Sequence, residues 1–225
     1  MRRSHAALFV FLAVWALTVE LLLLLTVWQQ PVERAIVWMA LGLLGLWVGL
    51  FGGLMLLFGR RLCAVAARLR IHWRLRFVLL ATALALVEEA AAVWMTNLAP
   101  LLGDPSGQAA ITASANYWEV VSRHSVVVFV PMFIAWALLL SWRSFSPFAV
   151  FLLFGLTGLL GEVIAFGPQN LLGGGFWILV YGLMVYLPAC AVQPLKAPPA
   201  RAWHVPLALL LPILASLPVV FLLNR

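Results

Sequence analysis

Five of the seven acidic residues in this chain lie inside or at the edge of long apolar stretches: Glu20, Glu88, Glu89, Glu119 and Glu162. A carboxylate surrounded by hydrocarbon is costly, so such groups are usually paired, protonated or turned toward a water-filled cavity. Carboxylate oxygens bind protons and hard cations, and they also activate water for hydrolysis. These five side chains are therefore the first candidates for chemistry.

The adjacent residues Glu88 and Glu89 are the most specific polar feature of the chain. Neighbouring residues on a helix point about 100° apart, so we expect at least one of the two to face the protein interior. Two carboxyls this close repel each other when both are ionised, which favours keeping a proton between them. Thr96 and Asn97 lie two turns further along the same stretch and extend its polar character.

Glu162 follows three glycines, Gly155, Gly158 and Gly161, that fall on the same arc of a helix. Small residues at this spacing allow the backbone of a neighbouring helix to approach closely. Glu162 is then expected to point toward that neighbour or into a cavity. The alternative is purely structural: the glycines pack a helix pair, and Glu162 is a neutral group hydrogen-bonded to its neighbour.

The segment 99–125 is expected outside the membrane, with Asp104 or Ser106 beginning a helix there. Polar residues then recur at helical spacing: Thr112, Asn116, Glu119 and Arg123. This stripe predicts one wall of an outward-facing polar cavity, or else an interfacial helix in which Glu119 pairs with Arg123. His124 adjoins the stripe and is the histidine best placed to act as an acid or base.

The elements that carry these residues are predicted to be membrane-spanning helices in a single all-α domain over 1–225. Hydrophobic residues make up 65% of the 225, charged residues 9%, and the mean hydropathy is +1.10. A span needs about 20 apolar residues, and seven stretches meet or approach this length. They are 7–28, 35–58, 75–98, 126–142, 148–166, 171–192 and 205–223.

Arginine placement predicts the orientation of this polytopic bundle. Arg2, Arg3 and His5 precede the first stretch, and six arginines crowd the connection 59–76. Cytoplasmic connections carry such an excess of basic residues, so we expect the N-terminus inside and the C-terminus outside a plasma (inner) membrane. The net charge of +7 then reflects topology and not a nucleic-acid site.

The connection 59–76 is itself predicted to be a basic amphipathic helix lying on anionic lipid of the inner leaflet. Its simpler interpretation is an arginine cluster that only sets topology. A membrane-protein partner or a second copy of the chain is a further expected contact. Cys63 and Cys190 fall at predicted cytoplasmic ends, where thiols stay reduced, so no disulfide is expected.

Three of the buried acids are predicted to share one depth. At about 1.5 Å per residue, Glu20, Glu88 and Glu162 each lie roughly 20 Å from the inner boundary, in the outer half of the bilayer. A shared depth makes a single cluster geometrically feasible. Glu20 is its weakest member, because it lies among leucines and serves equally as a lone hydrogen-bonding group between helices.

The pair Glu88 and Glu89 resembles the pair of glutamates in prenyl-endopeptidase-like intramembrane proteases. In that family an arginine follows the pair on the same helix, whereas here Ala90, Ala91 and Ala92 follow. The resemblance covers two residues and assigns no family. A retinal site is excluded because the last stretch holds no lysine, and membrane haem is disfavoured because the histidines lie at helix ends.

Two classes of function remain, together with a third that is structural. The first is binding or transport of a proton, a hard metal cation or a cationic solute, and no other cofactor is evident. The second is hydrolysis of a lipid or peptide by the same glutamates, and the third is an accessory subunit whose carboxyls only fasten helices together. The candidate binding residues are Glu88, Glu89, Glu162, Glu119, Asn97, Asn116 and His124.

Overall fold

The computed structural model describes residues 3–193 and 196–223, which form helices and connecting segments without a β-strand in these two ranges. The α-helices are α1 (Arg3–Thr26), α2 (Pro31–Leu43), α3 (Gly53–Ala67), α4 (Trp73–Asn97), α5 (Tyr117–Glu119), α6 (Val126–Trp142), α7 (Pro147–Phe166), α8 (Gly174–Ala191) and α9 (Val205–Leu223). Two π-helical segments, η1 (Leu44–Gly52) and η2 (Val120–His124), and two short 3₁₀ segments, η3 (Pro168–Leu171) and η4 (Ala202–His204), complete the set.

Six of the described helices are long and apolar enough to cross a membrane, and a seventh span results if one bent pair is counted as one. The bent pair is Tyr117–His124 with Val126–Trp142, whose axes differ by 47°. The predicted all-helical architecture is therefore confirmed, with six to seven helices that are candidate membrane spans.

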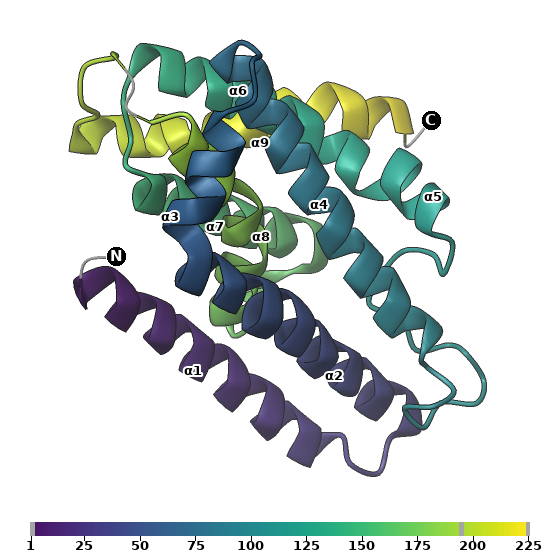
Figure 1. Ribbon diagram of the computed structural model, residues 1–225. Coiled ribbons are helices and arrows are strands. Elements are labelled where there is room, and N and C mark those ends of the chain that lie inside the picture. The colour runs from purple at the N-terminus through teal and green to yellow at the C-terminus, as the bar shows by residue number, and fades with distance from the viewer. Residues whose placement is uncertain (1–2, 194–195, 224–225) are drawn as a thin grey trace.

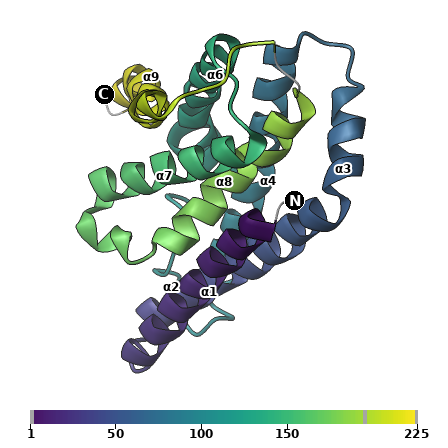
Figure 2. The ribbon, with the colours of Figure 1, turned by 90° about the vertical axis from the view of Figure 1, so that its left-hand side faces the viewer.

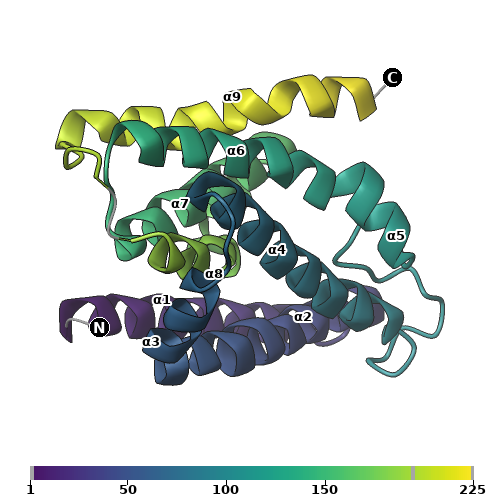
Figure 3. The same ribbon diagram turned by 45° about the horizontal axis from the view of Figure 1, so that its top comes forward.

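The helices form two outer pairs with a central pair between them. Figure 3 shows α1 beside α2 on one side, α6 beside α9 on the other, and α7 and α8 in between. The central helix α8 packs against α1, α3, α4 and α7. Glycines permit this crowding, because a Cβ on Gly175 would lie 2.6 Å from the carbonyl oxygen of Leu12, and one on Gly155 would overlap the backbone of Ile178.

The connection 59–76 differs from its prediction. The helix that begins at Pro31 continues through η1 to Ala67, and α3 turns away from the direction of α2 beyond that π-helical segment (Figures 1 and 2). The chain is then non-helical until α4 begins at Trp73, so no single basic helix covers 59–76. Competing hydrogen bonds explain the break: the Arg76 guanidinium donates to the carbonyls of Leu69 (2.7 Å) and Ile71 (3.3 Å).

Four helix ends gather on the side where most arginines lie. Arg74 Nε donates to Ser141 Oγ (2.7 Å), which joins the start of α4 to the end of α6, and Arg76 Nη1 reaches the Ala191 carbonyl at the end of α8 (3.3 Å). We call the start of α4 and the ends of α3, α6 and α8 together the arginine-rich end. Figures 1 and 3 show the two chain termini on opposite sides of the molecule.

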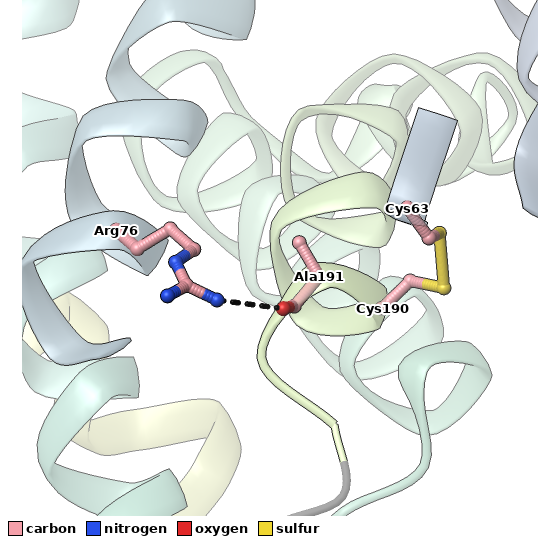
Figure 4. The surroundings of a disulfide bond; sticks show 4 residues. All are labelled: Cys63, Arg76, Cys190 and Ala191. Atoms are coloured by element: carbon pink, nitrogen blue, oxygen red, sulfur yellow. Dashed lines mark hydrogen bonds between the residues drawn. A yellow bond between two sulfur atoms is a disulfide. The ribbon is translucent and has the colours of Figure 1, made fainter. Parts of the chain in front are cut away.

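The two cysteines lie at this arginine-rich end and are joined, contrary to the expectation of reduced thiols. Cys63 near the end of α3 and Cys190 near the end of α8 form a disulfide, with their Cα atoms 5.7 Å apart (Figure 4). The sequence could not show this pairing, because it depends on α3 packing beside α8, and the two residues are 127 positions apart.

The outer segment 99–125 contains much less helix than predicted. Asp104 does not begin a helix; its carboxylate accepts the backbone N–H groups of Ser106 (3.0 Å) and Ala109 (2.6 Å) and folds the chain into a turn. Gly103 and Gly107 have positive φ angles of 104° and 69°, which a continuing helix does not allow. The helix begins only at α5.

Candidate functional site

Glu88 and Glu89 are both buried in the membrane-spanning helix α4, with 5% and 7% of their surfaces exposed. Sequence periodicity required only one of them to face inward. Both do so because α4 has a neighbour on two sides: it packs against α8 and against α6. Residues about 100° apart on such a helix are covered by different partners.

Two hydroxyl groups from other segments reach the carboxyls. Ser125 Oγ donates to Glu89 Oε1, and Tyr181 OH of α8 donates to Glu162 Oε1 of α7. Glu88 lies close enough to Glu89 and Glu162 to interact with both electrostatically, and Tyr181 interacts with all three carboxyls. Three glutamates from two helices therefore lie near one tyrosine and one serine. We call these five residues the carboxyl–hydroxyl cluster: Glu88, Glu89, Ser125, Glu162 and Tyr181.

The glycine face of α7 explains how Tyr181 comes to lie in this cluster. A Cβ on Gly158 would overlap the ring of Tyr181, so this glycine leaves the space that the ring occupies. Trp177 stacks on the same ring with centroids 5.9 Å apart, and Phe129 meets its edge at 5.6 Å. Gly155 and Gly158 thus pack α7 against α8, whereas Gly161 has no neighbour within 4 Å of an added Cβ, and the partner of Glu162 is this tyrosine.

Ser125 owes its position to the bend between η2 and α6. Its backbone is non-helical, with φ −126° and ψ −84°, and the chain changes direction there. This break places the serine hydroxyl at the Glu89 carboxylate instead of on the helix surface. Nothing in the sequence around Ser125 marks this role.

Tyr117 at the start of α5 approaches the cluster from the outer connection. Its hydroxyl donates to the Leu86 carbonyl (3.0 Å), two residues before Glu88, and it interacts electrostatically with Glu89. The prediction missed this residue because tyrosine at the edge of a span is ordinarily an interfacial anchor.

The cluster has acids without bases. No ion pair forms between the acidic and basic side chains that the structure describes, and Glu88 has no hydrogen-bonding partner in those ranges. The second oxygen of Glu89, Oε2, is buried and also lacks a hydrogen bond. A buried acceptor left without a donor costs about 1–3 kcal/mol, and more when it is charged, so this oxygen is suited to a proton or a cation.

Four predicted site residues lie at the end of α4 or in the outer connection, and they make other contacts. Asn97 donates to the carbonyls of Val93 (2.9 Å) and Ala115 (3.0 Å), which fastens the connection to the end of α4. Asn116 Oδ1 caps α5 by accepting the N–H of Trp118 at 3.0 Å. These two amides are therefore structural groups of the connection.

Glu119 and His124 are both exposed. Glu119 accepts a hydrogen bond from Ser114 Oγ (2.7 Å), and it does not form the predicted ion pair with Arg123, which the structure also describes. The intervening residues are π-helical, so the α-helical register on which that pairing depended is lost. His124 ends η2 beside Ser125 but makes no hydrogen bond to a described carboxyl.

Glu20 is buried in α1, with 8% of its surface exposed, and stands apart from the cluster. The electrostatic neighbours of Glu88 are Glu89 and Glu162 and do not include Glu20. The predicted common depth is therefore not sufficient for convergence. Helix α1 packs mainly on α2 and α8, and it meets α7 where His5 stacks on Phe148 and Phe9 contacts Phe151, near the start of α7 and away from Glu162.

Among the described residues, no group of three or more His, Cys, Asp or Glu side chains lies close enough together to hold a metal ion. Comparison of the chain with protein-family models, curated proteins and solved structures found no match. The proposal that follows accordingly depends on the geometry of the carboxyl–hydroxyl cluster.

Proposed function

We propose that this chain is a seven-span protein of the plasma (inner) membrane that binds a proton at the carboxyl–hydroxyl cluster in the course of proton or cation transport. The N-terminus and the arginine-rich end face the cytoplasm in this proposal, where the arginines contact anionic lipid. The cluster then lies in the outer half of the bilayer. A further membrane protein or a second copy of the chain is a candidate partner for the exposed apolar helices.

The observation that carries the proposal is the unpartnered oxygen of Glu89 within a group of three carboxyls. Three ionised carboxylates in a low-dielectric interior repel one another, and each loses the hydration it would have in water. A bound proton removes one of these charges and converts an acceptor into a donor. The repulsion among Glu88, Glu89 and Glu162 is then reduced.

A proton fits the present geometry better than a hard metal ion or a cationic solute. Hydroxyls of Ser125 and Tyr181 already donate to Glu89 and Glu162, and each of these bonds occupies lone pairs that a cation would need. A divalent ion such as Ca²⁺ takes about six to eight oxygen ligands and would require these hydroxyls to rotate away. A proton requires no such rearrangement.

Proton binding can be measured directly on the purified protein. Infrared absorption of protonated carboxyl groups should change with pH in the wild type, and this change should shrink in Glu89→Gln and Glu162→Gln, because an amide cannot ionise. Glu119→Gln is the matched control, since Glu119 is exposed and outside the cluster. An unchanged infrared titration in both cluster variants would refute the proposal.

Transport is tested separately, with the protein reconstituted in liposomes that contain a pH-sensitive dye. We expect an imposed pH gradient to collapse faster with the wild type than with Glu89→Gln. If the pH gradient collapses faster only when a metal ion or an organic cation is added, that cation and not the proton alone is the transported species. Hydrolysis of a lipid or peptide that His124→Ala impairs would instead support the enzyme hypothesis.

A second candidate is supported by the same two hydrogen bonds. The Tyr181 to Glu162 bond joins α8 to α7, and the Ser125 to Glu89 bond joins α6 to α4, so the carboxyls also fasten helices. An accessory subunit needs only this fastening. Glutamine retains an acceptor oxygen, so Gln variants with full thermal stability and an unchanged assembly function would favour the accessory role.

A further inference from the structure

The Cys63–Cys190 disulfide joins two helices that are already held together by packing. Helix α3 packs against α8, and a Cβ on Gly52, the η1 residue directly before α3, would lie 3.1 Å from Leu183 Cδ1 of α8, about three turns away from Cys63. If the disulfide were broken, this packing would keep the two sulfur atoms near each other. The bond is therefore suited to opening and closing without unfolding of the bundle.

The two cysteine residues differ in how much of their surface is exposed. Cys63 is buried, with 8% of its surface exposed, whereas Cys190 is partly exposed near the end of α8. A reagent arriving from the arginine-rich end meets Cys190 first. Thiol–disulfide exchange requires such an accessible sulfur, because the attacking thiolate must approach it directly.

Arginines lie at the ends of both helices that carry this pair. Arg60 and Arg61 precede Cys63 by less than one turn of α3 and are exposed, and the Arg76 guanidinium bonds to Ala191 beside Cys190 (Figure 4). Nearby guanidinium groups stabilise a thiolate, which is the form that attacks and leaves in exchange. The positive charge of this end therefore favours departure of Cys63 as a thiolate when the disulfide is attacked at Cys190.

The arginines also indicate on which side of the membrane the disulfide lies. Basic residues concentrate on the cytoplasmic side of membrane proteins, where persistent disulfides are rare and transient ones are catalytic or regulatory. A disulfide at an arginine-rich, cytoplasmic end is consistent with both observations if it cycles between its oxidised and reduced forms. We propose that Cys63 and Cys190 form a reversible redox site whose partner is a soluble dithiol on the cytoplasmic side.

In the reductive step, one thiolate of the dithiol attacks Cys190 Sγ, and the bond between the two cysteines breaks as Cys63 leaves as a thiolate. The second thiol of the partner then displaces Cys190 and closes a disulfide within the partner. Two electrons pass to the cysteine pair, and the two protons that the partner loses end on Cys63 and Cys190. Oxidation by a protein disulfide reverses these steps.

This site is independent of the proposed proton chemistry, although α8 connects the two regions because it carries both Cys190 and Tyr181. In the oxidised form α3 is covalently tied to α8. Reduction removes that tie and leaves only the helix packing.

The test uses the full-length chain in membrane vesicles and counts free thiols by the gel shift of a maleimide polymer. We expect two adducts after dithiothreitol, none after the oxidant diamide, and two again after a second reduction. Cys63→Ser and Cys190→Ser should each give one adduct in every state, because neither can close the intramolecular bond. Two adducts in the oxidised wild type would overturn the proposal, as would none after dithiothreitol in the folded protein.

The side of the membrane on which the disulfide lies is tested with a membrane-impermeant phosphine reductant. We expect thiols to appear in inside-out vesicles and not in right-side-out vesicles. Reduction confined to right-side-out vesicles would place this end outside the cell, where the bond would be a permanent structural one. A Cys63→Ser/Cys190→Ser double variant should give no adduct and controls for unspecific labelling.

Discussion

The carboxyl–hydroxyl cluster and the arginine-rich end satisfy their charged groups in different ways. At the arginine-rich end the guanidinium groups donate to backbone carbonyls and lie over aromatic rings, as Arg143 does with Trp142 at 4.6 Å. In the cluster, hydroxyls donate to two of the carboxyls, and Glu89 Oε2 is fully buried without a donor, whereas the fully buried atom without a partner at the arginine-rich end is Arg76 Nε. Neither region contains an ion pair among the described residues, so the acids and bases of this chain are satisfied separately.

This difference follows from what each environment supplies. Helix C-termini expose carbonyl oxygens that accept bonds from arginine, and water and lipid headgroups are available there as well. A membrane interior supplies no spare N–H groups, because the helical backbone uses its own. Carboxyls inside the bundle therefore depend on the few hydroxyls that packing brings to them, and their remaining oxygens require a proton or a cation.

The largest effect is expected from Gly158→Ala, which breaks the packing behind the cluster. The added methyl group overlaps the Tyr181 ring and should displace the hydroxyl from Glu162. Overpacking of this kind costs about 1–3 kcal/mol, so the thermal melting temperature should fall. Gly161→Ala is the matched control, since a Cβ there has nothing within 4 Å and the substitution favours the helix. Equal stability of the two variants would contradict the role given to Gly158.

Ser125→Ala should come next, because it removes the hydrogen bond to Glu89. Both oxygens of that carboxyl would then be without a donor, at a cost of about 1–3 kcal/mol in the free energy of unfolding. Ser122→Ala three residues earlier is the control, since that serine is exposed and bonds only to the Trp118 carbonyl. Chemical denaturation in detergent would measure the free energy of unfolding of both variants. A similar loss in both would show that the hydrogen bond from Ser125 to Glu89 contributes no more than that of an exposed serine.

The amino-acid sequence predicted the acids of the cluster but not its donors. Glu88, Glu89 and Glu162 stand out because a charged residue in an apolar stretch is rare, and their depth follows from counting along a helix. Ser125 and Tyr181 carry no comparable signal, since serine and tyrosine are common near helix ends. Their roles arise from a bend and from packing between helices that are distant in the sequence.

The irregular segments escaped prediction for a related reason. The π-helical turns at 44–52 and 120–124 preserve the apolar character of their stretches, so hydropathy does not reveal them. The outer connection was predicted to be helical from polar spacing alone. Its actual course is set by Asp104 and two glycines, whose turn-forming tendency was visible but was placed only at the start of the segment.

Arg76→Lys tests the other side of the comparison, the arginine-rich end. Lysine keeps the charge but loses the planar fork that reaches the carbonyls of Leu69, Ile71 and Ala191. We expect a loss of about 1 kcal/mol in stability, from hydrogen bonds worth roughly that much each, with topology unchanged. Arg70→Lys, at an exposed position of the same connection, should be neutral. The melting temperatures of the two variants test this expectation, and an equal change in both would contradict it.

The smallest effect concerns Asp104, a carboxylate outside the membrane that has the donors the cluster lacks. The hydrogen bond from the Ser106 hydroxyl, followed by the N–H of Ala109, lowers the pKa of Asp104 below its ordinary value near 3.8. A lowered pKa means that the ionised form stabilises the folded turn. This contribution is complete when the pH is above the ordinary pKa, and it disappears as the pH falls through the lowered pKa.

Protease cleavage within 99–116 should therefore accelerate in acid for the wild type. Cleavage would be measured with an acid-active protease, and an unstructured peptide would correct for the pH dependence of the protease itself. Asp104→Asn should be cleaved faster at neutral pH and should lack the acid-dependent rise, whereas parallel pH profiles would show that this carboxylate does not hold the turn.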